Sequence, residues 1–237
     1  MSKKNKRVLL KISGEALAWD TWNTFDTKVL DYVSQTIKDL QKENIEIGIV
    51  IGWWNIFRWV FWENLWFDEH TSHYMGMTAT YINWLALVNY FSNKKIKAKL
   101  MTSVSYEWVW ERFDKLKAIK YLEDSKIVIF AWWTWAPYFT TDTCGVLRAL
   151  EIEADMIIKA TQVDWVYNKD PKKHKDAKLY KKITYDEVLE KKLKVMDQTA
   201  IALARDNKMS LKIVNLLKKW SLKKAILGEN EGTVVSN

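Results

Sequence analysis

Groups that bind phosphate gather where three apolar runs of the sequence end. The first run leads into LLKISGEAL (9–17), the second into IVIGWWNIFRW (49–59), and the third is IVIFAWWTWAPYFTTD (127–142). Lysine and arginine side chains, hydroxyl groups and the backbone N–H groups at the start of a helix are the usual donors to a phosphate. Such groups support phosphoryl transfer, which depends on positioning and charge neutralisation more than on covalent catalysis.

The elements that must position these groups alternate between strands and helices. Short runs rich in Ile and Val, typical of strands buried on both faces, occur at 7–13, 45–52, 98–104, 126–131, 156–161 and 211–216. Helical patterns begin after Asp26 and cover about 78–91, 111–123, 142–153 and 197–207. We predict an α/β fold, a three-layer α/β/α sandwich around a mainly parallel twisted sheet, in a single domain of residues 1–237. The lysine-rich stretch 164–182 is predicted to be a mobile loop.

Adjacent tryptophans interrupt two of the three segments, at Trp53–Trp54 and at Trp132–Trp133. A bulky side chain at a strand-to-helix turn keeps the backbone away from a phosphate. With glycine in place of tryptophan the segments read IGGGNIFRG and FAGGTGAPYFTTD, which are glycine-rich turns with exposed N–H groups. The composition points the same way, because the chain has 15 Trp and only 7 Gly, whereas ordinary chains contain about 7% Gly.

Read with these glycines, the chain resembles the bacterial uridylate (UMP) kinase family of the amino-acid-kinase superfamily. The resemblance extends from LLKISGEAL through MGMTATYIN (75–83), LRALEIEADMIIKATQVDWVY (147–167) and VLEKKLKVMD (188–197) to LGENEGT (227–233). It implies the amino-acid-kinase fold and transfer of a phosphoryl group from ATP to UMP, giving ADP and UDP in pyrimidine nucleotide biosynthesis. It also implies Mg²⁺ as the cofactor that accompanies ATP, and a cytoplasmic homo-oligomer, usually a hexamer, with no nucleic-acid or membrane partner.

The resemblance also implies site residues. The expected catalytic residues are Lys11, Arg58 and Asp142. The residues expected at ATP are Lys11, Ser13, Gly14, Trp54, Arg58, Thr161, Tyr167 and Asp170. Those expected at UMP are Trp53, His73, Thr134, Trp135, Ala136, Pro137, Tyr138, Phe139, Thr140 and Thr141. No protein ligand of a metal is assigned, because Mg²⁺ bridges phosphates and keeps several waters.

Several residues have a second interpretation from sequence alone. Asp142 is expected to organise Lys11, and it is equally a candidate N-cap of the helix that follows, a role that does not exclude the first. Lys159 either faces the phosphates or is a solvated lysine at a strand end. Asp197 is interpreted as an N-cap, and Cys144 as a small buried hydrophobe. Family members usually carry Asp, a ligand of the UMP ribose, where this chain has His73. A histidine cannot accept hydrogen bonds from two hydroxyls as a carboxylate does.

Most of the tryptophans fall where the family has glycine. They are Trp19, Trp22, Trp53, Trp54, Trp59, Trp84, Trp132, Trp133, Trp135, Trp165 and Trp220. The others, Trp62, Trp66, Trp108 and Trp110, lie in variable stretches. UGA encodes glycine in a few bacterial lineages and tryptophan in some other codes, so a gene of the first kind translated with the second table gives this pattern. We therefore expect glycine at the eleven family-glycine positions of the natural protein. The alternative interpretation is a protein that uses its tryptophans for aromatic stacking.

Two other functions are compatible with parts of the sequence. One is a kinase of the same superfamily that acts on a carboxylate or carbamate, against which FAGGTGAPYFTTD argues. The other is a basic, Trp-rich protein that binds single-stranded nucleic acid. The formal net charge of +8 favours a lysine-rich surface over a polyanionic partner, because the lysines are scattered. The start, MSKKNKRVLLKIS, has no long apolar segment typical of a signal peptide, and the single cysteine fits a reducing cytoplasm.

Overall fold

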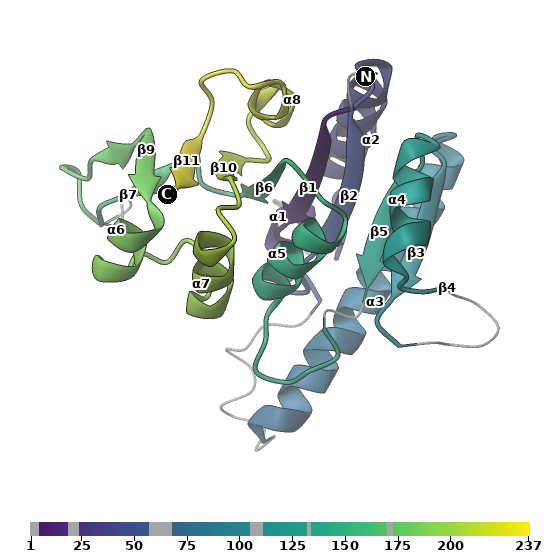
Figure 1. The fold of residues 1–237 in the computed structure, drawn as a ribbon, viewed down its shortest axis with the longest axis horizontal. Helices are drawn as coiled ribbons and strands as arrows, with labels where there is room; N and C mark the ends of the chain where they lie inside the picture. Colours follow the sequence, from purple (N-terminus) through teal and green to yellow (C-terminus); the bar gives the residue numbers. More distant parts are fainter. Residues whose placement is uncertain (1–4, 19–23, 57–67, 105–110, 132–133, 170–172) are drawn as a thin grey trace.

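One sheet organises the computed structural model, which describes residues 5–18, 24–56, 68–104, 111–131, 134–169 and 173–237. Nine strands of the described residues form it in the order β4-β3-β5-β2-β1-β6-β10-β11-β9 (Figure 1). All neighbours pair in parallel except β10 and β11. The bounds are β1 Arg7–Ile12, β2 Glu46–Ile51, β3 Ala98–Thr102, β4 Glu111–Arg112, β5 Ile127–Ala131, β6 Met156–Thr161, β9 Lys182–Thr184, β10 Leu211–Asn215 and β11 Thr233–Ser236. The mainly parallel sheet that the sequence predicts is confirmed.

Helices cover both faces of the sheet. They are α1 Gly14–Leu17, α2 Thr27–Lys42, α3 Glu69–Asn93, α4 Lys115–Glu123, α5 Thr141–Glu151, α6 Tyr185–Glu190, α7 Gln198–Asp206 and α8 Ser221–Leu227. The connection β1–α2–β2 moves one way along the sheet and β5–α5–β6 moves the other way, so right-handed crossovers place α2 and α5 on opposite faces. Helix α2 packs against α3 and α8, whereas α5 packs against α7. The predicted three-layer α/β/α arrangement is therefore confirmed.

Aspartate side chains set the start of four helices. Asp26, Asp68, Asp114 and Asp197 each accept a hydrogen bond from a backbone N–H of the following helix, which satisfies one of its unpaired donors. The caps expected at Asp26 and Asp197 are thus confirmed.

Two helix boundaries differ from the prediction. Helix α3 begins at Glu69 rather than near 78, because Asp68 caps its start. The sequence does not indicate this start, because the apolar residues of the helix follow no helical period. Helix α4 begins at Lys115 rather than 111, because Glu111–Arg112 pairs with β3 as β4 and Asp114 then caps the helix.

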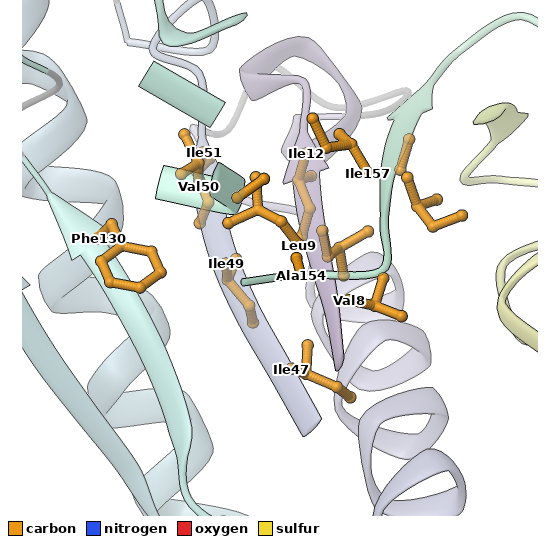
Figure 2. Packing of buried hydrophobic residues seen from close by; sticks show 14 of the residues in the cluster. Val8, Leu9, Ile12, Ile47, Ile49, Val50, Ile51, Phe130, Ala154 and Ile157 are labelled. Carbon is orange, nitrogen blue, oxygen red and sulfur yellow. The ribbon is translucent and has the colours of Figure 1, made fainter. Parts of the chain in front are cut away.

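The core lies between the central strands and the helices. Every residue of β1, β2 and β5 is buried, which explains why these strands read as continuous apolar runs. Figure 2 shows Leu9 and Ile12 of β1 with Ile49 of β2 and Ile157 of β6 in this cluster. Because the strands are fixed from both faces, their carboxyl ends form a rigid edge for a site.

The stretch 164–182 contains two short strands. Its described residues contain β7 Val166–Tyr167 and β8 Leu179–Tyr180, which pair as a small antiparallel sheet. The predicted mobile loop does not include these strands, because two-residue strands are too short to show an alternating pattern. Its mobility stays a prediction. Among the residues that the structure describes, no helix is long and apolar enough to cross a membrane.

Candidate active site

A buried cluster of three charged side chains lies at the carboxyl edge of the sheet. Lys11 of β1 and Lys159 of β6 are register partners on adjacent parallel strands. The Nζ atom of Lys11 lies 2.6 Å from Oδ1 of Asp142, and Nζ of Lys159 donates to Oδ2 of the same carboxylate at 2.7 Å. The side chains are 8%, 13% and 13% exposed for Lys11, Lys159 and Asp142. Two ammonium groups around one carboxylate leave an excess positive charge, which suits a phosphate.

Burial and the two lysines act in opposite directions on Asp142. Burial alone disfavours its charge, but the nearby Lys11 and Lys159 ammonium groups outweigh burial and lower the pKa of Asp142 to about 2. The pKa of Lys159 is lowered, chiefly by burial and also by the repulsion of Lys11, while Asp142 opposes the shift. Asp142 is therefore a permanent anion at neutral pH, and it cannot donate a proton there.

The start of α5 fixes where this carboxylate points. The hydroxyl of Thr140 accepts from the backbone N–H of Asp142 at 3.0 Å, so Thr140 is the N-cap. The alternative role of Asp142 as the N-cap is wrong, because its carboxylate is turned to the lysines. Thr140 and Thr143 donate their hydroxyl hydrogens to Asp197, which also caps α7. One carboxylate thus joins the starts of α5 and α7.

The turns after β1 and β2 touch each other. A Cβ atom on Gly14 would lie 2.7 Å from the backbone nitrogen of Trp54 and 2.8 Å from Oδ1 of Asn55. Such distances exclude any side chain at position 14 unless a loop moves. Gly52 N–H donates to the carbonyl of Ile12 at 2.8 Å, which fastens the second turn to the first. The sequence predicts these two turns as neighbours, and the structure brings them together.

Aromatic side chains occupy the second turn. Trp53 is 5% exposed, and its ring lies against Gly76 of α3, where an added Cβ would come within 3.1 Å of the indole. The ring of Trp54 stacks on that of Trp53 with centroids 5.5 Å apart. His73 of α3 lies 5.1 Å, ring to ring, from Tyr138, and its Nε2 lies 3.8 Å from Glu69.

A cavity of about 1040 Å³ collects most of the predicted site residues. Of the predicted ones it is lined by Lys11, Ser13, Gly14, Trp53, Trp54, His73, Phe139, Thr140, Thr141, Asp142, Thr161 and Tyr167. Five predicted UMP residues do not line it, namely Thr134, Trp135, Ala136, Pro137 and Tyr138. Arg58 and Asp170 lie outside the described residues. The volume of the cavity is at the upper end of the range for small-molecule sites, about 300–1,000 Å³.

Sequence reasoning missed part of the cavity wall. Lys191, Lys192 and Lys194 line it from the segment after α6, and the carbonyl of neighbouring Val195 accepts from Lys159 at 2.6 Å. The run KKLK was a visible signal, but lysines on a helix end are usually solvated. The alternative of a solvated Lys159 is wrong, since its ammonium group lies in the buried cluster.

The part of the chain that the structure describes has neither a reactive thiol nor a cluster of metal-binding side chains beside these lysines. Cys144 of α5 is 1% exposed, and burial raises its pKa to about 11, which confirms the interpretation of a buried hydrophobe. The described residues contain no group of three or more His, Cys, Asp or Glu side chains arranged to hold a metal ion.

Known proteins are similar to this chain over nearly its full length. Residues 6–215 match the amino acid kinase family. The chain belongs to that family. It is 43% identical to a uridylate kinase from Colwellia psychrerythraea, covering 98% of this chain and 94% of that protein. The solved UMP kinase of Bacillus anthracis superposes with a TM-score of 0.93 at 37% identity, covering 99% of this chain and 97% of the other.

A second solved structure, UMP kinase from Ureaplasma parvum, superposes with a TM-score of 0.92 at 30% identity. The match covers 99% of this chain and 100% of the other. The resemblance to bacterial uridylate kinases is thereby confirmed, and the α/β fold with it. Relatives named uridylate kinase or UMP kinase align with this chain over nearly their full length.

Replacing Asp142 with Asn tests the charge cluster. Since the folded pKa of Asp142 is about 2, below its ordinary 3.8, the carboxylate stabilises the fold above about pH 4 and loses that contribution as the pH falls through 2. The difference in free energy of unfolding between the parent and Asp142→Asn should be level from about pH 5 to 8 and shrink towards pH 2. Urea unfolding at a series of pH values measures it.

Asp176→Asn is the matched control, because Asp176 pairs with Lys169 on the exposed surface. Its effect should be small at every pH. If the difference for Asp142→Asn stayed level all the way down to pH 2, the folded pKa of Asp142 would not lie below its ordinary value.

Proposed function

We propose that this chain transfers the γ-phosphate of ATP to UMP, giving ADP and UDP. The observation that carries the proposal is the buried Lys11–Asp142–Lys159 cluster, with its excess positive charge, in the wall of a cavity of about 1040 Å³. Relatives with the uridylate kinase name over nearly the full length support UMP as the acceptor. They argue against a carboxylate or carbamate acceptor and against a protein that binds nucleic acid.

The residues have separate roles in this reaction. An oxygen of the UMP phosphate attacks the γ-phosphorus of ATP, the bond to the bridging oxygen breaks, and its electron pair leaves with ADP. Lys11 neutralises charge that builds up on the transferred group. Asp142 holds Lys11 and Lys159 together rather than moving a proton, because both of its oxygens face ammonium groups.

The nucleotides contact separate parts of the site. Ser13, Gly14 and position 54 line the phosphate end of ATP, together with Arg58. Thr161, Tyr167 and Asp170 hold its adenine end. Position 53, His73 and the segment 134–141 receive UMP; of that segment, Phe139, Thr140 and Thr141 line the cavity. The hydroxyl of Thr140 donates to Asp197, so its backbone is the group left for UMP.

We propose that Mg²⁺ arrives with ATP. Mg²⁺ prefers phosphate oxygens and water, and it often takes few ligands from the protein. The donor set fits this arrangement, since the carboxylate nearest the chemistry, Asp142, is already held by two lysines. When bound, the ion would neutralise phosphate charge beside Lys11.

The acceptor is tested with the recombinant chain carrying glycine at the eleven tryptophan positions where the family has glycine. It should phosphorylate UMP faster than CMP, dTMP or AMP. In the same chain, Lys11→Ala should lower kcat by a factor of about 10²–10³, because Lys11 acts mainly in the transition state. Coupled ADP release measures both. Lys212→Met is the control: Lys212 is also a buried strand lysine, donating to Glu229 O, but does not line the cavity. Equal rates with all four nucleotides would refute the assignment to UMP.

His73 is proposed to contact the ribose of UMP, where the family usually has Asp. His73→Asp should lower the KM for UMP, because a carboxylate accepts from both ribose hydroxyls. The KM for UMP is measured between about pH 5.5 and 8 in both proteins, and the KM for ATP is the internal control. An unchanged KM for UMP would place position 73 away from the ribose.

We further propose that the natural protein has glycine at the tryptophan positions given above. Trp135 and Trp220 have φ values of 57° and 69°, in the left-handed region that costs a side-chain-bearing residue about 1–2 kcal/mol. The indole nitrogen of Trp84 is buried without a hydrogen-bond partner among the described residues, which costs about 1–3 kcal/mol. Trp53 and Trp54 fill space beside the phosphate turn. Each of these penalties disappears with glycine.

Peptide mass spectrometry on protein from the native organism tests this proposal. It should find glycine at positions 53, 54, 132, 133 and 135, and the gene should carry UGA at each. Gly14 and Gly52 are controls that should be encoded by GGN codons. Tryptophan in those peptides, or UGG in the gene, would refute the recoding.

Three further properties complete the proposal. Residues 1–237 form one domain, supported by the continuous sheet. The protein is a homo-oligomer, a hexamer by family resemblance; Ile82 and Leu85 on α3 are 47% and 39% exposed and support a contact between copies. It acts in the cytoplasm, supported by the free thiol of Cys144. Sedimentation of the purified chain tests the oligomer.

A further inference from the structure

A buried amide on α3 is bonded to the phosphate turn. Asn83 is 0% exposed. Its Nδ2 donates to the carbonyl of Gly52 at 2.8 Å and to Oδ1 of Asn55 at 2.7 Å. Its Oδ1 accepts from Nδ2 of Asn55 at 2.8 Å. The Gly52 carbonyl can only accept, so it fixes which end of the Asn83 amide faces the turn.

The partner amide reaches the other turn of the site. Nδ2 of Asn55 also donates to the carbonyl of Thr24 at 3.0 Å. Oδ1 of Asn55 lies against Gly14, where an added Cβ would be only 2.8 Å away. The position of the Asn55 side chain therefore sets the separation of the turns after β1 and β2. Neither Asn55 nor Asn83 lines the cavity.

We propose that Asn83 is a positioning residue for phosphoryl transfer, acting through the Asn55–Asn83 amide pair. The pair holds residues 52–55 on the rigid helix α3 and keeps the backbone of this turn beside Gly14 and the first strand end. Glycine-rich turns have little stiffness of their own, so their geometry has to come from such an attachment. The inference rests on the proposed function, because it assigns the turn to phosphate binding.

The test compares variants that break the pair with one that does not, in the same form of the chain as the UMP assay. Asn83→Leu keeps the shape and removes all three hydrogen bonds. Asn55→Ala breaks the same pair at the turn, where the Asn55 side chain is half-buried. This substitution leaves the packing of α3 without a new cavity. Thr80→Val is the control: Thr80 is also 0% exposed on α3, and its hydroxyl donates to Met77 O within the same helix.

We expect Asn83→Leu and Asn55→Ala each to lower kcat about 10–100-fold, since a small misplacement of reacting groups costs about that much. The double variant should lose little more than either single variant, because the two residues act as a unit. Thr80→Val should keep its kcat even if its Tm falls. If Asn83→Leu matched Thr80→Val in kcat at equal Tm, Asn83 would be merely structural and the proposal overturned. If Asn83→Leu failed to fold, Asn55→Ala would decide alone by the same criterion.

Hydrogen exchange without substrate separates this inference from the function itself. The backbone amides of residues 52–55 should exchange faster in Asn83→Leu and Asn55→Ala than in Thr80→Val. If exchange is faster in these two variants but the parent chain does not phosphorylate UMP, the proposed function is refuted and the attachment still stands. Unchanged exchange in both variants would overturn the attachment, whatever the activity of the parent.

Discussion

The attraction between Asp142 and two ammonium groups opposes a repulsion that the sheet itself creates. Lys11 and Lys159 are paired in register on parallel strands, so their charges are neighbours whenever the sheet is formed. A buried pair of like charges is tolerated only with a counter-charge between them. That counter-charge comes from the first turn of α5, whose start is fixed by Thr140 and, through Asp197, by the start of α7. The placement of two helices thus follows from the neutralisation of one pair of lysines.

The turns around the cluster follow a second constraint, the distance between backbones. Gly14 faces the nitrogen of Trp54 and the side chain of Asn55 at distances that no Cβ can share. The charge cluster and the two turns therefore occupy neighbouring ends of the same strands but depend on different forces. Electrostatics places the lysines, whereas the absence of a side chain at Gly14 and the Asn55–Asn83 amide pair place the turns.

Much of the arrangement of strands and site residues can be predicted from the sequence. The six long strands are mainly apolar runs, and β1, β2 and β5 are buried throughout because helices cover both faces of the sheet. The residues that end these strands meet because parallel strands share an edge. Lys11, Gly14 and Asp142 are therefore predictable as neighbours. Gly52 and Asn55 are likewise visible at the end of β2.

Other parts depend on packing that no local pattern records. Asn83 lies within an apolar helix, 31 residues from the carbonyl it bonds, and nothing in its neighbourhood indicates that partner. The start of α3 lacks helical periodicity, and the two-residue strands β4, β7 and β8 are too short to show alternation. The segment 134–138 looks from sequence like part of the UMP site, but its residues do not line the cavity.

The burial of Cys144 has a practical consequence for following motion in this molecule. It is the chain's only cysteine, it is 1% exposed, and burial raises its pKa. A cysteine introduced at an exposed position such as Leu116 of α4, 75% exposed, would therefore be the only thiol that reacts quickly with a dye or spin label. Pairs of such labels report distances across the cavity as nucleotides bind, and no native residue needs to be removed first.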